Sequence, residues 1–335
     1  MSEQSPHSKR IGKLLWKTLI VVAIVLLVGG LVYSKVFGPT DTQAQPQEIF
    51  VQEDESVSDV ARELTQKGFV RNEWVFQVAY LRESYGHTIR PGGYQISKSM
   101  DAWTIASVLT SPPYLAWVKI PVGVRKEQIA NILSSALGWD ETQKKAWLVA
   151  TETAGKDYVE GVYFPDTYFI PTTLGPAQVA GTIRSHFQTV FQPYAQEAVT
   201  KHMSWPTVLT IASLIEREAG SIEDMPIISG IIQKRLASGM PLAIDATLQY
   251  MSNTQETGWW APPAKAGTYA NSPFNTYKNK GLPPHPIAEP GLSAIEAALN
   301  PIPTKCVFYI HDTHGKLHCS PTYKGQLSNI NKFLK

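Results

Sequence analysis

Two glutamates in an apolar stretch are the residues best placed to do chemistry in this sequence. Glu216 and Glu218 lie in "TIASLIEREAG" at residues 210–220. At about 100° per residue, the stretch predicts a helix whose apolar stripe is flanked by both carboxyls, with Arg217 facing water. A carboxyl in apolar surroundings has a raised pKa and can hold a proton near neutrality, as a general acid must. The alternative is that both glutamates are solvated residues at the rim of an ordinary amphipathic helix. Helix geometry alone does not say which of the two, Glu216 or Glu218, would be the acid.

A long polar loop supplies further hydrogen-bonding groups. Residues 261–291 are too rich in Pro, Gly and Asn for regular structure, and such a loop in a compact domain is usually functional. Asp245, in "LAIDATLQY", is another acid in an apolar setting, with a helix N-cap as its structural alternative. For Asn275 the structural alternative is an Asx turn. The candidate substrate-binding residues are Asp245, Ser272, Asn275, Thr276 and Tyr277.

Other kinds of chemistry find little support. The sequence has no GxSxG motif, phosphate loop or dinucleotide fingerprint. His311, His314 and His318 share one expected hairpin, but their spacing does not favour a metal site. We therefore predict no cofactor and no metal, and the net charge of +2 is too small to argue for nucleic acid. A carboxyl beside uncharged polar groups suits a glycan, because carboxylic acids usually cleave glycosidic bonds.

The N-terminal region predicts a membrane anchor. Residues 1–17 carry four basic side chains, and an uncharged apolar run follows from Thr18 to Ser34. Leu14, Leu15 and Trp16, just before it, lengthen the apolar stretch to about the span that a bilayer needs. No small-residue cleavage site follows it, as a signal peptide would require. We predict one uncleaved spanning helix at 18–37, with the tail 1–17 in the cytoplasm and the rest outside. A buried core helix is the alternative.

The rest of the chain is expected to form a linker and two domains. The polar stretch 38–48 is the linker. Strand–turn–helix patterns begin at Ile49 and Gly92, which indicates a small LysM-like β-α module over 49–115. A third such pattern opens the domain 116–335, in which helices dominate. The fold class expected is α+β: a single transmembrane helix, a small LysM-like module and a larger mixed α+β catalytic domain.

Only two cysteines are present, and they flank a predicted hairpin. Cys306 and Cys319 lie on either side of "VFYIHDTHGKLH", whose turn is expected near residues 312–314. Strand pairing would place the cysteines roughly opposite each other, in an oxidising compartment. A disulfide and two buried free thiols both remain open, and neither indicates a catalytic cysteine.

Four motifs in order carry a resemblance to a known family. The chain resembles the endolytic murein transglycosylases, the YceG-like group, from its membrane helix to Lys335. The family's catalytic acid is the second glutamate of an A-S-x-x-E-x-E pattern, which implies Glu218 and leaves the role of Glu216 open. The motifs are "EGVYFPDTYFIP" at 160–171, "IASLIEREAG" at 211–220, "LAIDATLQY" at 242–250, and "SPFNTYKNKGLPP" at 272–284 with "PG" at 290–291.

This sequence departs from the family pattern at a few positions. His285 stands where a glycine is common, and Glu289 where an asparagine is common. Near the C-terminus, Leu317, Cys319 and Gln326 fall where many members carry histidine, phenylalanine and a second histidine. These departures concern fine substrate contacts rather than the reaction.

The resemblance implies a reaction and a location. The expected reaction is endolytic cleavage of the β-1,4 bond between N-acetylmuramic acid and N-acetylglucosamine in nascent peptidoglycan, which leaves 1,6-anhydro ends and terminates strand elongation. Such a lyase needs one carboxyl used twice, whereas a hydrolase needs two. The implied location is the bacterial plasma (inner) membrane, with penicillin-binding proteins of the synthesis complex as candidate partners. A non-catalytic peptidoglycan-binding scaffold is the alternative from another class, and a true hydrolase is a third.

Overall fold

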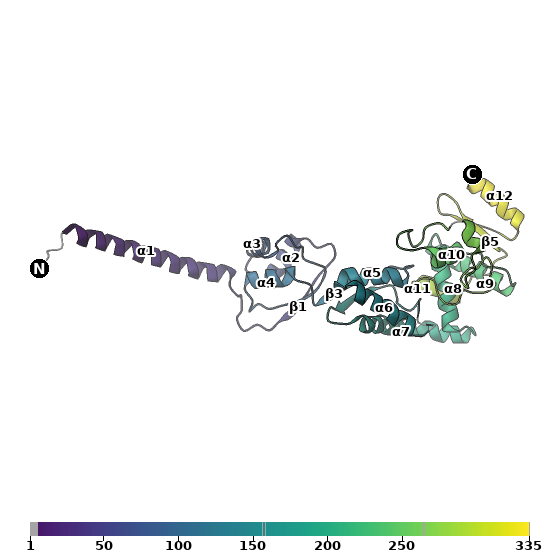
Figure 1. Cartoon of the computed structure of the whole chain (residues 1–335), viewed down its shortest axis with the longest axis horizontal. Helices are drawn as coiled ribbons and strands as arrows, with labels where there is room; N and C mark the ends of the chain where they lie inside the picture. The colour runs from purple at the N-terminus through teal and green to yellow at the C-terminus, as the bar shows by residue number, and fades with distance from the viewer. Residues whose placement is uncertain (1–5, 156, 158, 264, 335) are drawn as a thin grey trace. The chain divides into compact units, whose positions relative to one another are not determined.

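The chain folds into two units that both contain helices and strands. The computed structural model describes residues 6–155, 157, 159–263 and 265–334. The expected α+β class is confirmed, and Figure 1 labels the elements in chain order. Unit 1 comprises Met1–Trp117 and Phe169–Thr173, and unit 2 comprises Val118–Tyr168 and Leu174–Lys335.

The expected N-terminal helix is present. Helix α1 (Pro6–Phe37) contains an apolar stretch, Leu19–Phe37, that is long and apolar enough to cross a membrane and is not buried by protein. Its last turn packs on unit 1, where the ring of Phe37 stacks 4.9 Å from that of Trp103. An exposed apolar helix of this length is compatible with a membrane anchor.

Unit 1 is a small sheet covered by helices. Strands β1 and β2 are antiparallel and pair Ile49 with Tyr94, and two helices lie between them in sequence. The helices begin at side-chain caps, such as Asn72, whose side-chain oxygen Oδ1 accepts the N–H of Val75 at 3.0 Å. The elements are β1 (Gln47–Val51), α2 (Val57–Gln66), α3 (Glu73–Glu83), β2 (Gly92–Ile96) and α4 (Ala102–Thr110).

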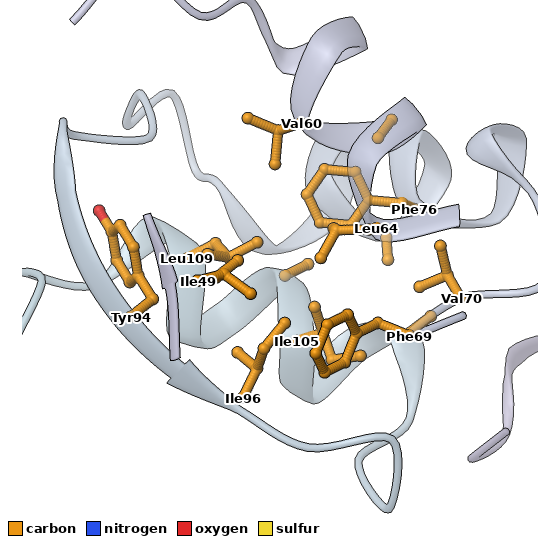
Figure 2. Close-up of a cluster of buried hydrophobic side chains, with 14 of the residues drawn as sticks. Ile49, Val60, Leu64, Phe69, Val70, Phe76, Tyr94, Ile96, Ile105 and Leu109 are labelled. Atoms are coloured by element: carbon orange, nitrogen blue, oxygen red, sulfur yellow. The ribbon is translucent and has the colours of Figure 1, made fainter. Parts of the chain in front are cut away.

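The core of unit 1 follows from the periodicity of these elements. In β1, Ile49 and Val51 are buried whereas Phe50 is exposed, as a period of two requires. Helix α2 buries residues one turn apart, including Val60 and Leu64. Figure 2 shows side chains from β1, β2 and the three helices meeting in one apolar cluster.

The stretch 38–48, expected as a polar linker, is hydrogen-bonded to unit 1. The Thr40 hydroxyl donates to the carbonyl of Gly68 at 2.7 Å. The Ser97 hydroxyl donates to the carbonyl of Ala44 at 2.8 Å. These bonds hold the segment between α1 and β1 against the module.

Two further strands complete the sheet of unit 1 and carry the chain between the units. The strand order is β1-β2-β3-β4, with β3 at Leu115–Lys119 and β4 at Thr167–Pro171. Gly92, at the start of β2, has φ of +148°, and a Cβ there would lie 2.4 Å from the Leu115 carbonyl oxygen. Only glycine fits this close approach of the two strands.

Unit 2 is mostly helical. Helix α8 packs against α7, α9, α10 and α11. The helices are α5 (Lys126–Leu137), α6 (Glu141–Thr153), α7 (Pro176–Thr200), α8 (Trp205–Glu218), α9 (Met225–Ala237), α10 (Asp245–Ser252), α11 (Leu292–Leu299) and α12 (Tyr323–Phe333). Short 3-10 turns lie at η2 (Ile222–Asp224) and η3 (Lys265–Tyr269), and strands β5 (Phe308–His311) and β6 (Leu317–Ser320) form a hairpin.

Helix α8 is buried on every side along its middle, and the prediction that Arg217 faces water is wrong. Thr210 and Ser213, on the same side of the helix as Arg217, are buried. Their hydroxyls donate to carbonyls one turn back, to Pro206 and Thr210, both at 2.8 Å. The Arg217 guanidinium lies 4.0 Å from the centre of the Trp260 ring rather than in water. The helix is amphipathic in sequence, but its neighbours cover both faces.

The cysteine hairpin forms as predicted, and of the two alternatives the disulfide is present. Strand β5 pairs with β6 so that Tyr309 lies opposite Cys319. The Cys306 and Cys319 Cα atoms are 5.7 Å apart and the sulfurs are bonded. The turn is closed by the Gly315 N–H, which donates to the Asp312 carbonyl at 2.9 Å.

Candidate active site

Glu218 is the last residue of α8, and its carboxyl meets a tyrosine from the hairpin. The Tyr309 hydroxyl donates to Glu218 Oε2 at 2.5 Å. The helix starts at Ser204, whose hydroxyl caps the Thr207 N–H, and it ends at Glu218 because Ala219 is extended. Glu218 therefore sits at the helix end, partly exposed, with one carboxyl oxygen bonded and the other without a protein partner among the hydrogen bonds of the described residues.

The surroundings of Glu218 favour its protonated form. Burial of the carboxyl raises the pKa of Glu218 to about 7, and the negative charge of Asp245 contributes to the rise. The Tyr309 hydrogen bond and the charges of Arg235 and Arg217 oppose it. At pH 7 about half of the Glu218 carboxyls then carry a proton, so the group can both give and accept one.

Asp245 and Tyr277 form a second carboxyl–phenol pair beside Glu218. The Tyr277 hydroxyl donates to Asp245 Oδ1 at 2.5 Å. Burial raises the pKa of Tyr277, and the charges of Asp245 and Glu218 raise it further, so the phenol keeps its proton. Asp245 is exposed and is the first residue of α10, after Ile244 at the N-cap. The structure thus brings Glu218, Asp245 and Tyr277 together.

Asn275 lies beneath this group and bonds within the loop. The side chain is buried, and its amide donates to the carbonyls of Ala270 and Thr268 at 2.8 and 3.1 Å. Its oxygen accepts the Tyr277 N–H at 3.1 Å, which is the Asx turn weighed as its structural alternative. These bonds fix the backbone that carries Tyr277, and the predicted contact of Asn275 with substrate stays a prediction.

Thr276 and Ser272 also bond within the protein. The buried Thr276 hydroxyl accepts the Ile244 N–H at 3.0 Å, and its carbonyl accepts the Ala243 N–H at 3.0 Å. Thr276 thereby ties the loop to the start of α10. The Ser272 hydroxyl accepts the Phe274 N–H at 3.3 Å, and the residue is partly exposed. Their predicted contacts with substrate stay predictions.

Sequence reasoning missed two residues of this site, Tyr309 and Arg235. Arg235 Nε donates to the Val307 carbonyl at 2.6 Å, and its guanidinium also donates to the Leu242 carbonyl. Burial lowers the pKa of Arg235, and the charge of Glu218 raises it again. The predicted hairpin was the one signal that pointed to Tyr309, but a strand pattern does not say which helix end its residues meet.

Two histidines of the hairpin, His311 and His318, pair with different aspartates. His311 Nε2 lies 3.4 Å from Asp224, and His318 Nε2 lies 2.8 Å from Asp312. Within the described part of the chain, no group of three or more histidine, cysteine, aspartate or glutamate side chains is arranged to hold a metal ion.

The sequence profile of the YceG-like family matches residues 49–332 of this chain. That range covers both units beyond the N-terminal helix and includes Glu218, Asp245 and Tyr277. The chain belongs to the YceG-like family.

Relatives and a solved structure agree with membership of the YceG-like family. An endolytic murein transglycosylase of Bacillus subtilis is 28% identical over 291 residues, which are 80% of this chain and 79% of that protein. One from Streptococcus pneumoniae serotype 2 is 26% identical over 314 residues, which are 84% of this chain but 57% of that longer protein. The crystal structure of a YceG-like protein from Listeria monocytogenes shares the fold, with a TM-score of 0.63 at 23% identity, covering 84% of this chain and 98% of that one.

Glu216, the other acid of the YceG-like A-S-x-x-E-x-E pattern, bonds a backbone N–H. Its Oε2 accepts the Gly291 N–H at 3.0 Å, and burial raises the pKa of Glu216. Gly291 is the N-cap of α11, so the bond joins the C-terminal end of α8 to the start of α11. The two glutamates thus have different partners: Glu216 bonds the backbone at the start of α11, and Glu218 bonds the Tyr309 hydroxyl.

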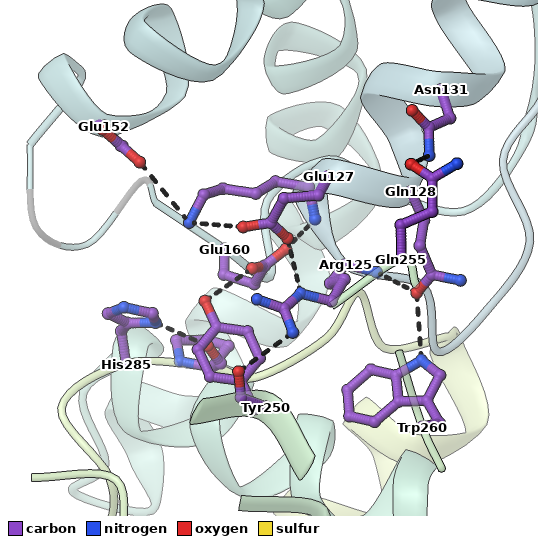
Figure 3. A network of polar contacts seen from close by, with 12 residues as sticks. Arg125, Glu127, Gln128, Asn131, Glu152, Glu160, Tyr250, Gln255, Trp260 and His285 are labelled. Carbon is purple, nitrogen blue, oxygen red and sulfur yellow. Dashed lines mark hydrogen bonds and ion pairs between the residues drawn. The ribbon is translucent and has the colours of Figure 1, made fainter. Parts of the chain in front are cut away.

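A second pair of carboxyls, Glu160 and Glu289, is fully buried in unit 2. Glu160 accepts the Lys126 N–H at 2.6 Å and the Tyr250 hydroxyl at 2.9 Å. Figure 3 shows Glu160 meeting Tyr250, with Arg125 beside it. Glu289 accepts the N–H groups of Gly161 and Tyr163 at 2.9 and 2.8 Å.

One shared proton accounts for two carboxyls in contact inside the core. Burial raises the pKa of Glu160 to about 7, and the charge of Glu127 adds to the rise. Burial and the charge of Glu160 raise the pKa of Glu289 well above its ordinary value, and the Glu289 side chain hydrogen-bonds that of Glu160. Both N–H groups at Glu289 are fixed donors, whereas the Tyr250 hydroxyl at Glu160 can turn from donor to acceptor, so Glu289 suits the ionised role and Glu160 the protonated one. The pair ties "EGVYF" at 160–164 to the segment before α11.

We expect Glu160→Gln to be tolerated and Glu289→Gln to destabilise the protein. The amide at 160 keeps an acceptor for Lys126 and a donor toward Glu289, and the Tyr250 hydroxyl can turn to accept from its NH₂. An amide at 289 instead turns an NH₂ toward a backbone N–H, which cannot accept. That mismatch costs about 1–3 kcal/mol of unfolding free energy. Denaturant unfolding of the full chain in detergent at pH 6, below the pKa of Glu160, measures it. Equal losses in both variants would contradict the shared proton.

The same pair predicts how stability depends on pH. A carboxyl whose folded pKa is raised binds more protons folded than unfolded, so stability falls as pH rises from the ordinary glutamate pKa of 4.5 toward about 7. Glu160→Gln should flatten this fall, because its amide does not titrate. A Tm–pH slope that is unchanged in Glu160→Gln would show that other groups cause it.

Proposed function

We propose that this protein is a membrane-anchored lytic transglycosylase of peptidoglycan. It cleaves the β-1,4 bond between N-acetylmuramic acid and N-acetylglucosamine within nascent strands and leaves 1,6-anhydro ends, which terminates strand elongation. The observation that carries the proposal is a partly exposed Glu218 carboxyl that holds a proton near neutral pH beside two phenols. The relatives named as endolytic murein transglycosylases support the same reaction.

Glu218 acts twice in the proposed reaction. Its proton moves to the glycosidic oxygen as the bond from that oxygen to the muramyl C1 breaks, and N-acetylglucosamine leaves with a free O4 hydroxyl. The Glu218 carboxylate then takes the proton of the muramyl C6 hydroxyl, whose oxygen bonds to C1 and closes the anhydro ring. Glu218 ends protonated and no water is consumed. A pKa near 7 suits both steps.

Asp245 and Tyr277 are proposed to hold the sugar at Glu218. Both present exposed surface beside the acid, and carboxylate and phenol oxygens suit sugar hydroxyls or an N-acetyl N–H. Asn275 and Thr276 act from beneath by fixing the backbone of Tyr277, and Ser272 lies at the exposed side of the same loop. Substrate contact by these three is part of the proposal.

The proposal includes an anchor and a glycan-binding module. We place α1 across the plasma (inner) membrane, with the basic N-terminus cytoplasmic and both units outside. Unit 1 has the β-α-α-β order of a LysM-like module, with antiparallel β1 and β2, and would bind glycan. Anchoring confines the enzyme to new strands near the bilayer, where penicillin-binding proteins would be its partners.

Product analysis tests the function. Full-length protein in detergent is incubated with uncrosslinked glycan strands in heavy-oxygen water, and the products are weighed by mass spectrometry. The expected products end in 1,6-anhydro-N-acetylmuramic acid, lighter by one water than hydrolysis products, with no label. Labelled reducing ends would identify a hydrolase instead. Strand binding without any cleavage would favour the scaffold.

A further inference from the structure

Tyr309 is the group in closest polar contact with the proposed acid, and it comes from a distant part of the chain. Its hydroxyl donates to Glu218 Oε2 at 2.5 Å across ninety-one positions of sequence. Burial raises the pKa of Tyr309 well above its ordinary value, and the charge of Glu218 raises it further. The phenol therefore keeps its proton and stays a donor at every pH at which the enzyme would work.

The backbone of Tyr309 is fixed from three sides. Strand pairing places it opposite Cys319, which is bonded to Cys306 just before β5. On α12, the amide of Gln326 donates to the Tyr309 carbonyl at 2.8 Å. Arg235 donates to the carbonyl of Val307, two residues before the tyrosine. A short hairpin held by these contacts keeps the Tyr309 side chain in one position.

We propose that Tyr309 is a positioning residue of the reaction, which binds Oε2 of Glu218 and leaves Oε1 as the oxygen that exchanges protons with the sugar. This inference rests on the proposed function. In a neutral carboxyl the carbonyl oxygen is the better acceptor, so with Oε2 accepting from Tyr309 the proton of Glu218 lies on Oε1. After that proton has left, the same bond holds the carboxylate in place for the return transfer.

The groups that face Glu218 predict what loss of the phenol would do. Asp245 and Tyr277 face it from α10 and the loop, and Arg235 and Arg217 from α9 and α8. Among the described residues, Tyr309 is the partner that hydrogen-bonds the carboxylate, so Tyr309→Phe removes a contact that favours ionisation. The pKa of Glu218 should rise, while the carboxyl loses its fixed orientation. A misplacement of about 1 Å costs on the order of 10²-fold in rate.

The experiment compares Tyr309→Phe with Tyr194→Phe in the full-length protein. Tyr194 also donates to a glutamate, Glu296, at 2.8 Å, but it belongs to α7 and has no contact with Glu218. We expect kcat of Tyr309→Phe to fall about 10–100-fold with little change in KM, and the alkaline limb of its pH profile to move upward. Tyr194→Phe should behave as wild type.

The outcomes separate this inference from the proposed function. Wild-type protein that makes no anhydro ends contradicts the function, and the role of Tyr309 falls with it. Wild-type activity together with a Tyr309→Phe rate and pH profile equal to those of Tyr194→Phe contradicts the role of Tyr309 alone. A purely structural defect would lower the active fraction without moving the pH limb.

The disulfide provides a second test of whether the fixed position of Tyr309 matters for the rate. Replacing both cysteines, Cys306→Ser with Cys319→Ser, frees the hairpin and should lower kcat several-fold in the direction of Tyr309→Phe. If the disulfide acts through Tyr309, combining the serines with Tyr309→Phe adds no further loss. Losses that multiply in the triple variant would show that the disulfide does not act through the phenol.

Discussion

Replacing Glu218 with glutamine is expected to abolish formation of anhydro ends. Glutamine keeps the size of the side chain and an oxygen that accepts from Tyr309, but it has no acidic proton to give and cannot take one back. Removing a general acid–base lowers rates by about 10²–10⁴-fold, and a group used in both steps belongs at the upper end. The measurement is the yield of anhydro-ended fragments from uncrosslinked strands at equal protein concentration.

Glu216→Gln is the matched control for this prediction. Glu216 is two residues away on the same helix, its pKa is also raised by burial, and glutamine keeps an oxygen for the Gly291 N–H. It should retain most of the activity, since its role is to hold α11. Comparable loss in both variants would mean that the end of α8 matters only structurally. Full activity of Glu218→Gln would remove the proposed acid altogether.

The second large effect is that of pH on the wild-type rate. The first step needs a protonated Glu218, whose pKa burial raises to about 7. As pH rises above 7 the protonated fraction falls, so kcat/KM should fall about tenfold per unit, or about 10²-fold by pH 9. An acid with the ordinary glutamate pKa of 4.5 would instead lose activity from mildly acidic pH upward.

Asp245→Asn tests whether the charge of Asp245 sets the pH above which kcat/KM falls, the alkaline limb of the pH profile. The carboxylate of Asp245 raises the pKa of Glu218, and asparagine removes the charge while keeping an oxygen for Tyr277. The alkaline limb should therefore move to lower pH, opposite to its shift in Tyr309→Phe. An unmoved limb in Asp245→Asn would show that this charge does not act on the acid, whatever happens to the rate.

The broad organisation of this protein could be predicted because it depends on local patterns. An uncharged apolar run gives a spanning-length helix, and the paired segments around residues 312–314 give the hairpin, although only the structure decides between a disulfide and two free thiols. Helix periodicity also placed both glutamates at the edge of a buried stripe. It could not choose between them, because Glu216 and Glu218 differ only in what folds against them: a glycine N–H and a tyrosine hydroxyl.

What the patterns missed is set by tertiary contacts. Arg217 was expected in water, but it stacks on Trp260, which follows it by more than forty residues. The motif at 160–171 reads as a turn with aromatics, and nothing in it shows that Glu160 shares a proton with Glu289. Tyr309 is held at Glu218 by contacts of the hairpin with α9 and α12. Such partners are far apart in sequence and have no period to detect.

Titration of the Glu218 carboxyl is the measurement that tests the central claim most directly. The full-length protein is labelled with ¹³C at glutamate side-chain carboxyls, and Glu218→Gln identifies the signal by its disappearance. We predict a midpoint of about 7 for this carboxyl in the wild-type protein. A midpoint near the ordinary glutamate pKa of 4.5 would leave Glu218 ionised at neutral pH and would contradict its role as the acid.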